Sequence, residues 1–208
     1  MNRGLFLDLD GTLADSLGVM RQAYGRFLRG FGAAASDEEF ESLNGPPLPE
    51  IVRLLKARWE LQGAESDLLG VYEALVDEAY EAVPPASHAL EVLTAARRRG
   101  WTVGVVTSNS RLRTRRWLAR VGLASEVSLI VAGEDASRGK PAPDPYRKAL
   151  QISGADPTLS LAVEDSLSGV TAALAADLTT LAIDPNLDRS WPEPARPIRG
   201  LKDLLLLV

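Results

Sequence analysis

The sequence predicts an α/β fold in which a doubly wound parallel sheet carries one helical insertion. Five short apolar runs are rich in Val, Ile and Leu and lack strict alternation, which is typical of strands buried on both faces. Helical stretches lie between the later runs, and this alternation predicts a parallel sheet with helices on both faces. The expected strands are residues 5–9, 102–107, 128–133, 159–164 and 179–184.

The first expected strand, residues 5–9, has two acids at its end, Asp8 and Asp10. A buried carboxylate is costly unless it is paired or bound to a cation. Residues i and i+2 of a strand share a face, so both acids would meet at the strand end where open α/β sheets bind ligands. The alternative is a β-hairpin, because Asp-Gly between apolar runs is a strong turn signal. An EF-hand loop is excluded, since Leu13 and Val19 stand where it needs Gly and Glu.

The segment that follows contains no convincing strand between residues 17 and 83. In residues 50–62 and 66–83, apolar side chains recur at spacings of three and four, which predicts amphipathic helices. The sequence NGPPLP at 44–49 predicts a turn between helices. We therefore expect a helical insertion, and its six aromatic side chains are expected to form its core: Tyr24, Phe27, Phe31, Trp59, Tyr72 and Tyr80.

Four helices are expected around the later strands, and their borders carry start and stop residues. A serine precedes two of them and a glycine follows, which predicts the N-cap and the C-terminal end. Asp144 is the expected N-cap of a third helix, with Pro145 at its first position. The helices are expected at residues 87–100, 110–122, 144–154 and 165–176, with Ser87 and Ser110 as serine caps and Gly100 and Gly122 as stops. The arginines of residues 111–120 are interpreted as a solvated face.

A second polar cluster, VVTSNS at residues 105–110, follows the second expected strand and precedes a helix. Thr107, Ser108 and Asn109 would stand where unpaired N–H groups and the helix dipole attract anions. The alternative is that Ser108, Asn109 and Ser110 only cap the helix.

A third cluster surrounds Lys140, which stands before a loop with three prolines in five residues. Prolines stiffen a loop, and a stiff loop can aim an ammonium group at a phosphate. A P-loop is excluded, because Glu134 and Pro141 stand where it needs Gly and Ser or Thr. The alternative is a solvated lysine.

The fourth cluster, Glu164 and Asp165, ends the fourth expected strand. Two adjacent carboxylates suit a hard cation such as Mg²⁺. The alternative is that Asp165 or Ser166 caps the next helix while Glu164 interacts with its dipole. All four clusters follow strands of one parallel sheet, so they would converge at one edge. A divalent cation and a phosphate in that cleft would explain the acids.

The four clusters, DLDGT, VVTSN, GKPAPDPY and VEDSLSG, occur in the order found in one family. The chain resembles the haloacid dehalogenase superfamily of phosphohydrolases, in particular the phosphoglycolate phosphatase and β-phosphoglucomutase branch. The resemblance implies a Rossmann-like core of residues 1–15 and 84–208 with a helical cap of residues 16–83. It also implies a Mg²⁺-dependent phosphatase that hydrolyses a small phosphorylated metabolite, similar to phosphoglycolate or a sugar phosphate, through an aspartyl-phosphate.

The resemblance implies a role for each acid. Asp8 would be the nucleophile that attacks phosphorus. Asp10 would protonate the leaving oxygen and later activate water. Asp8, the backbone carbonyl of Asp10, and Asp165 would hold Mg²⁺, and Glu164 would bind it directly or through water.

The resemblance also implies which residues bind the phosphoryl group and the rest of the substrate. Thr107 and Lys140 would hold the phosphoryl oxygens, helped by backbone N–H groups at Ser108 and Asn109. The cap would choose the substrate, and its candidate ligands are Arg21, Asn44 and Arg53.

Three other functions are weighed against a phosphatase. A mutase of the β-phosphoglucomutase type would carry a hinge histidine where this chain has Met20. A phospho-accepting receiver domain would have all its acids before the lysine, whereas Glu164 and Asp165 follow Lys140. A catalytically silent binding protein of the same fold is the third alternative, although every catalytic side chain is present.

Composition narrows the function classes further. The net charge of -5 argues against binding nucleic acid as the main task. The chain has no cysteine and one histidine, His88, which excludes thiolate catalysis and a multi-histidine zinc site. No signal peptide and no apolar stretch of membrane-spanning length is visible, so we expect a cytoplasmic monomer or homodimer that does not bind membranes.

Overall fold

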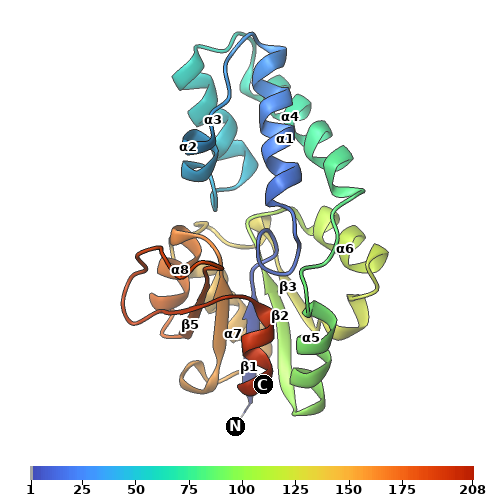
Figure 1. Ribbon diagram of the computed structural model, residues 1–208, viewed down its shortest axis with the longest axis vertical. Coiled ribbons are helices and arrows are strands. Elements are labelled where there is room, and N and C mark those ends of the chain that lie inside the picture. The colour runs from blue at the N-terminus through green and yellow to red at the C-terminus, as the bar shows by residue number, and fades with distance from the viewer. Residues whose placement is uncertain (1) are drawn as a thin grey trace.

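A computed structural model describes residues 2–208 of the chain, and its centre is a six-stranded sheet (Figure 1). All neighbouring strands are parallel, in the order β3-β2-β1-β4-β5-β6, which confirms the predicted fold class and excludes a hairpin after β1. The strands are β1 (Arg3–Leu7), β2 (Trp101–Val106), β3 (Leu129–Val131), β4 (Leu161–Glu164), β5 (Thr179–Ile183) and β6 (Arg196–Ile198).

Strand β6 was not expected from the sequence. It is three residues long, contains Pro197 and lies at the sheet edge, so it has no apolar run to reveal it. Proline is tolerated at an edge because the missing N–H is not needed for a second ladder.

The register of the central strands sets the position of the site. Leu7 at the end of β1 is paired with Val105 of β2 and Val163 of β4. The residues that follow these three strands therefore leave the sheet side by side. The Asp8 N–H extends the ladder by donating to the Val163 carbonyl at 3.0 Å.

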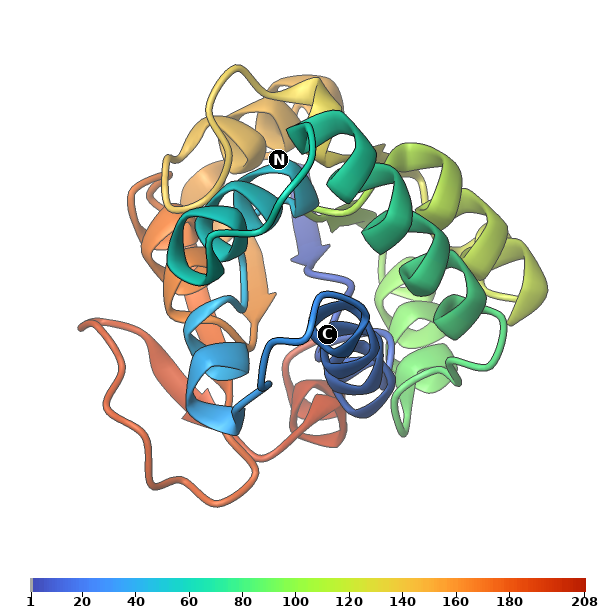
Figure 2. The ribbon, with the colours of Figure 1, turned by 90° about the horizontal axis from the view of Figure 1, so that it is seen from above.

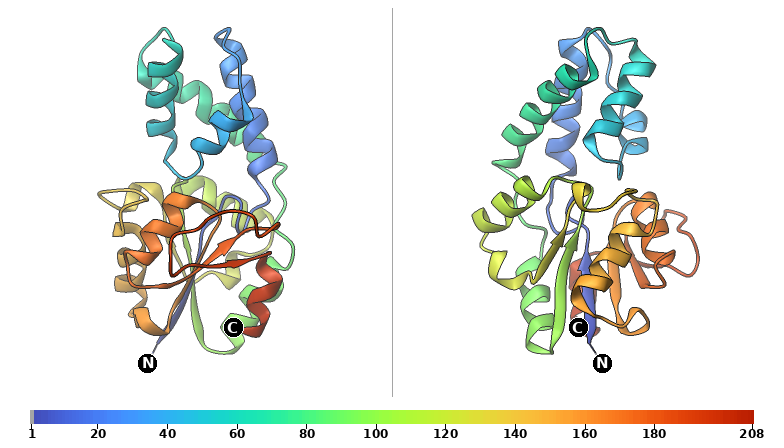
Figure 3. Two further views of the ribbon diagram at one scale, coloured as in Figure 1. Left: turned by 60° about the vertical axis from the view of Figure 1, so that its left-hand side comes forward. Right: turned by 180° about the vertical axis from the view of Figure 1, so that it is seen from behind.

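Helices cover both faces of the sheet (Figure 3). Because strand side chains alternate, Leu5 and Leu7 of β1 face one layer and Phe6 faces the other. The first layer contains α5 (Ala89–Arg98), α6 (Arg111–Arg120) and the 3₁₀ helix η4 (Leu201–Leu206), and the second contains α7 (Asp144–Ser153) and α8 (Leu167–Leu174). Short 3₁₀ turns complete this part at η1 (Ala124–Glu126), η2 (Gly133–Asp135) and η3 (Pro157–Leu159).

Helix starts differ from expectation at two places. Ser110 caps α6 as predicted, by accepting a bond from the Arg113 N–H. The residue before α5 is His88 in the left-handed conformation, not Ser87. Helix α7 includes Asp144 instead of being capped by it, because Arg138 and Ser137 hold its carboxylate.

The segment between β1 and α5 is helical throughout and lies beyond the carboxyl ends of the strands (Figures 1 and 3). It contains α1 (Leu17–Gly30), α2 (Asp37–Ser42), α3 (Leu48–Trp59) and α4 (Glu65–Tyr80). Helix α4 packs against both α1 and α3. Phe27 stacks on Tyr72 with ring centroids 4.8 Å apart, whereas Phe31, expected in this core, is 38% exposed.

The chain enters and leaves this helical segment through two adjacent connections. The Asp15 N–H donates to the Pro84 carbonyl at 3.1 Å, and the Ala86 N–H donates to the Leu13 carbonyl at 2.8 Å. Seen from above, α1 and α4 rise from this side while α2 and α3 lie apart from it (Figure 2). The loop between α2 and α3 contacts the core at a separate point, where the Gly45 carbonyl accepts a bond from Ser108 Oγ.

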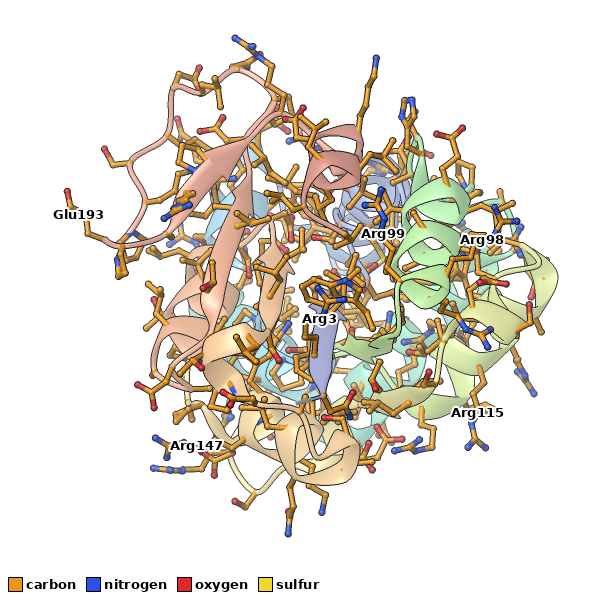
Figure 4. All side chains as sticks on the ribbon, turned by 90° about the horizontal axis from the view of Figure 1, so that it is seen from below. Arg3, Arg98, Arg99, Arg115, Arg147 and Glu193 are labelled. Atoms are coloured by element: carbon orange, nitrogen blue, oxygen red, sulfur yellow. The ribbon has the colours of Figure 1, made fainter. Side chains whose placement is uncertain are left out.

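At the amino ends of the strands, Arg3 contacts the start of the neighbouring strand β2 (Figure 4). Arg3 donates to the Arg99 carbonyl at 2.8 Å and stacks over Trp101 at 4.6 Å. Among residues 2–208, no helix combines the length and apolar character needed to cross a bilayer.

Candidate active site

A cleft separates the carboxyl edge of the sheet from the helical segment. It encloses about 80 Å³. Its floor contains Asp8, Asp10 and Lys140, followed by Thr107, Ser108 and Asn109 from the loop after β2. Sequence-distant clusters thus meet at one edge, as the parallel sheet predicts.

Three carboxylates and one ammonium group meet at the floor and directly beneath it. Asp8, Glu164 and Asp165 each offer an oxygen within 4.8 Å of the others, and all three residues are buried. Lys140 Nζ lies 2.6 Å from Asp8 Oδ1 and 2.5 Å from Glu164 Oε1, and it also donates to the Val106 carbonyl. Lys140 is buried, so the alternative of a solvated loop lysine is wrong.

Two glycines allow the acids to come this close. Gly11 has φ +75°, and a Cβ there would lie 2.2 Å from an Asp165 carboxylate oxygen. In α8, a Cβ on Gly169 would lie 2.0 Å from Glu164 Oε2. Ser166 caps this helix by accepting a bond from the Gly169 N–H at 3.1 Å. Both residue conformation and residue size are therefore constrained around the carboxylates.

Burial and crowding alter the ionisation of these groups. Burial raises the pKa of Asp8 well above its ordinary value, although Lys140 opposes this. Burial and the neighbouring Glu164 raise the pKa of Asp165 to about 7. Burial alone would lower the pKa of Lys140, but Asp8 and Glu164 outweigh it and raise that pKa. Lys140 is therefore the positive charge in the centre, and the carboxylates outnumber it.

The carboxylates fit a divalent cation. Asp165 Oδ1 is buried and has no hydrogen-bond partner among the described residues. An orphaned buried carboxylate oxygen beside two more carboxylates matches the all-oxygen ligand set that Mg²⁺ prefers. Such an ion would also offset the crowding that raises the pKa of Asp8 and Asp165.

Asp10 lies beside this centre and is held by three donors. Ser16 Oγ donates to Oδ1 at 2.7 Å, and the Tyr80 hydroxyl also donates to Oδ1. Asn109 Nδ2 donates to Oδ2 at 3.1 Å and to the Tyr80 oxygen at 2.9 Å. The pKa of Tyr80 is raised, mainly by burial and next by the negative charge of Asp10. The hydroxyl therefore keeps its proton and acts as a donor.

The loop after β2 places its polar atoms between the floor and the helical segment. Thr107 Oγ1 accepts a bond from the Asn109 N–H at 3.0 Å, and Ser108 Oγ donates to the Gly45 carbonyl at 2.6 Å. Asn109 Oδ1 accepts a bond from the Ser110 N–H at 2.9 Å. Ser110 alone of the three possible caps serves as the N-cap of α6, whereas Thr107, Ser108 and Asn109 line the cleft.

Of the three candidate substrate ligands in the helical segment, only one lies at the cleft. Asn44 lines the cleft, and its Nδ2 donates to Asp165 Oδ2 at 3.0 Å. Arg21 does not line it, because its guanidinium pairs with Asp37 at 3.0 Å on the outer side of α1. Arg53 is exposed and lines a separate hollow with Lys56 and Glu60. Among the described residues, the cleft therefore receives neither arginine.

Sequence reasoning missed three residues that support the site. Tyr80 was expected only to pack in the helical segment, yet its hydroxyl reaches Asp10. Tyr146 donates to Glu164 Oε1 at 2.5 Å. Arg113 was interpreted as part of a solvated face, but it is buried, with Nε 2.6 Å from Asp77 Oδ1 and Nη1 2.7 Å from Asn109 Oδ1. Of these three residues, only Tyr146 had a signal in the sequence, because it belongs to the DPY sequence that follows Lys140.

Comparisons with known proteins identify the family and the fold. A family profile described as Haloacid dehalogenase-like hydrolase matches residues 5–183. The pyrophosphatase PpaX of Oceanobacillus iheyensis is 26% identical over 211 residues, covering 99% of this chain and 96% of its own length. Hexitol phosphatase A of Escherichia coli is 30% identical over 188 residues, covering 89% and 85%. The crystal structure of CbbY from Rhodobacter sphaeroides in complex with phosphate has a TM-score of 0.81 at 23% identity, covering 98% and 96%.

Replacing Gly169 tests the close approach of Glu164. We expect Gly169→Ala to lower the thermal midpoint and weaken Mg²⁺ binding, because its Cβ would displace the Glu164 carboxylate. Gly70→Ala in α4 is the matched control, since a Cβ there meets nothing within 4 Å. That change should stabilise the protein by about 0.5–1 kcal/mol through helix propensity. If thermal denaturation shows that both variants are stabilised equally, the Glu164 carboxylate does not limit the size of residue 169.

The raised carboxyl pKa values lead to a pH dependence. A group with a folded-state pKa near 7 and an unfolded value near 3.8 binds more protons when folded, so stability falls as pH rises through that window. In chelator, the thermal midpoint should fall between pH 5 and pH 8. Mg²⁺ at about 100 times its Kd should raise the midpoint at pH 8 by about 5–10 °C, and by less at pH 5 where protons compete.

Sodium chloride at equal ionic strength is the control for this measurement. An equal Mg²⁺ shift at both pH values, or a sodium effect of the same size, would remove the carboxylate cluster as the binding site.

Proposed function

The chain belongs to the haloacid dehalogenase-like hydrolases and is a phosphoric monoester hydrolase, and we propose that it is a Mg²⁺-dependent phosphatase acting through an aspartyl-phosphate. The substrate is a small phosphorylated metabolite, and the finer expectation of phosphoglycolate or a sugar phosphate comes from the resemblance alone. The contact between Lys140 and Asp8 carries this proposal, because it sets a buried cation beside a buried carboxylate. The pair suits attack on an anionic phosphate, which a carboxylate alone would repel.

Asp8 is the nucleophile in this proposal. One Asp8 oxygen forms a bond to phosphorus while the bond from phosphorus to the ester oxygen breaks, and Asp10 gives its proton to that oxygen. Asp10 then takes a proton from water as the water oxygen attacks phosphorus. The bond from phosphorus to Asp8 breaks, and inorganic phosphate and free Asp8 result.

Charge neutralisation and positioning supply most of the rate in phosphoryl transfer. Lys140 and Thr107 hold phosphoryl oxygens, with the N–H groups of Ser108 and Asn109 nearby. Asp8, Asp165 and the Asp10 carbonyl would hold Mg²⁺, with Glu164 bound directly or through water, and the ion would supply charge neutralisation at the phosphoryl group. The orphaned Asp165 oxygen supports this ligand set.

The helical segment, residues 16–83, acts as a cap over the core of residues 1–15 and 84–208. Its hinges lie near residues 15–17 and 83–85, where the two connections are hydrogen bonded to each other. The contacts from Ser108 to Gly45 and from Asn44 to Asp165 support a closed state in which the cap excludes bulk water.

A phosphomutase is the second candidate, because the same aspartyl-phosphate would serve it. Met20 lines the cleft and offers no proton-transfer group where a mutase carries histidine, which favours hydrolysis. A silent binding protein would show no turnover in spite of its complete set of acids.

Asp8→Asn tests whether Asp8 is the nucleophile. Phosphate release from a panel of small monoesters with Mg²⁺ should fall at least about 10⁴-fold, because an amide does not replace the nucleophile. The thermal midpoint should stay within a few degrees, since the side chains have the same shape. Asp188→Asn, at an exposed acid outside the cleft, is the matched control and should keep full activity. Turnover that survives in Asp8→Asn rules out the nucleophile assignment.

Tyr80→Phe tests whether Tyr80 positions Asp10. The change removes one donor and leaves those from Ser16 and Asn109, so kcat should fall about tenfold with little change in KM. Tyr24→Phe is the control, because its hydroxyl donates to Glu39 within the cap. That variant should lose stability and keep its kcat. If both variants lose kcat equally, Tyr80 has only a structural role.

A further inference from the structure

The wall of the cleft that faces the catalytic floor comes from the helical segment and is apolar. Six aliphatic or aromatic side chains from α1, α2, α3 and the adjoining loops form it: Leu17, Met20, Phe40, Leu43, Leu48 and Ile51. The floor, in contrast, is polar throughout. A phosphate ester whose phosphoryl group is on the floor would place its leaving group against this apolar wall.

No charged residue of the described helical segment lines the cleft. Apart from Lys140, Arg113 of α6 is the only cation of the described residues that lines the cleft, and its guanidinium is bound by Asp77 and Asn109. The amide nitrogen of Asn44 is bound by Asp165. A carboxylate or second phosphate on the leaving group would find no free cation along this wall.

One hydroxyl remains on this wall. Tyr72 lines the cleft and is 2% exposed, and its hydroxyl makes no hydrogen bond to another described residue. A hydroxyl that faces the cleft without a protein partner can form a hydrogen bond with a ligand group in the cleft. Among the described residues of the wall, this hydroxyl and the remaining amide groups of Asn44 are the free polar side-chain contacts.

We propose that the preferred substrate is a phosphate monoester with a short, uncharged and mainly apolar leaving group, on which a hydroxyl is favourable only where it reaches Tyr72 or Asn44. This specificity rests on the proposed phosphatase function. Polyol or carboxylate leaving groups would bury polar atoms against Leu, Met and Ile without partners, which is unfavourable. An apolar group of the same length would gain contact with the wall instead.

Two pairs of esters test this, with phosphate release measured in Mg²⁺. Propyl phosphate is compared with glycerol 1-phosphate, and ethyl phosphate with phosphoglycolate, so that each pair keeps its carbon number. We expect kcat/KM to favour the apolar member at least about tenfold in each pair. Propanol is a slightly poorer leaving group than glycerol, so chemical reactivity would not produce this order.

Variants of the wall link the preference to the residues. Met20→Gln keeps the side-chain length and adds an amide, and should reduce the propyl preference about tenfold or more. Met20→Leu should keep it. Leu54→Gln, on an exposed position of α3 outside the cleft, controls for a polar change in the cap and should also keep the preference. Tyr72→Phe should spare propyl phosphate and lower kcat/KM for 3-hydroxypropyl phosphate.

The outcomes separate the two proposals. Active enzyme that prefers glycerol 1-phosphate or phosphoglycolate overturns the apolar specificity and leaves the phosphatase intact. A preference for propyl phosphate that Met20→Gln does not change overturns the assignment to this wall. If thermal denaturation shows a folded protein that releases no phosphate from these esters or from p-nitrophenyl phosphate, the proposed phosphatase function is rejected. The proposed specificity is then rejected with it.

Discussion

Crowding of negative charge at the ends of β1 and β4 is the constraint on which the rest of the structure depends. Three buried carboxylates share this place with one ammonium group. Burial of excess like charge is unfavourable, so every neighbouring feature serves to make the cluster tolerable. The small residues at 11 and 169 give it room, the Tyr146 hydroxyl and Lys140 satisfy its oxygens, and a cation fits the oxygen that remains unpaired. The same excess of charge that limits stability prepares the site to bind a metal.

The sequence predicted the sheet and the residues that meet at its edge, because both follow from short-range rules. Apolar runs locate strands buried on both faces, and parallel strands bring their carboxyl ends together whatever the connecting segments contain. Asp8, Lys140 and Glu164 could therefore be placed side by side although they are far apart in the chain. Strand β6 escaped because three residues at an edge carry too little pattern.

Contacts across the cleft were beyond sequence reasoning, since they depend on how the helical segment lies over the sheet. Asn44 reaches Asp165, whereas Arg21, a candidate of the same standing, pairs with Asp37 on the outer surface. The ring of Tyr80 fits the apolar periodicity of its helix, so the sequence pattern predicted a packed ring. The pattern contains no information on the hydroxyl, which donates to Asp10. Arg113 shows the same limit, because charge suggests exposure unless the partners, here Asp77 and Asn109, are known.

The two connections to the helical segment also bear on how such a protein can change over time. Because Asp15 is bonded to Pro84 and Ala86 to Leu13, the segment begins and ends at almost the same point of the core. An inserted unit whose ends meet can be exchanged or lengthened without displacing the strands around it. In the proposed enzyme, the residues that choose the leaving group and those that perform the chemistry lie on separate pieces of chain, so one catalytic core could acquire new substrates by replacement of a single contiguous stretch.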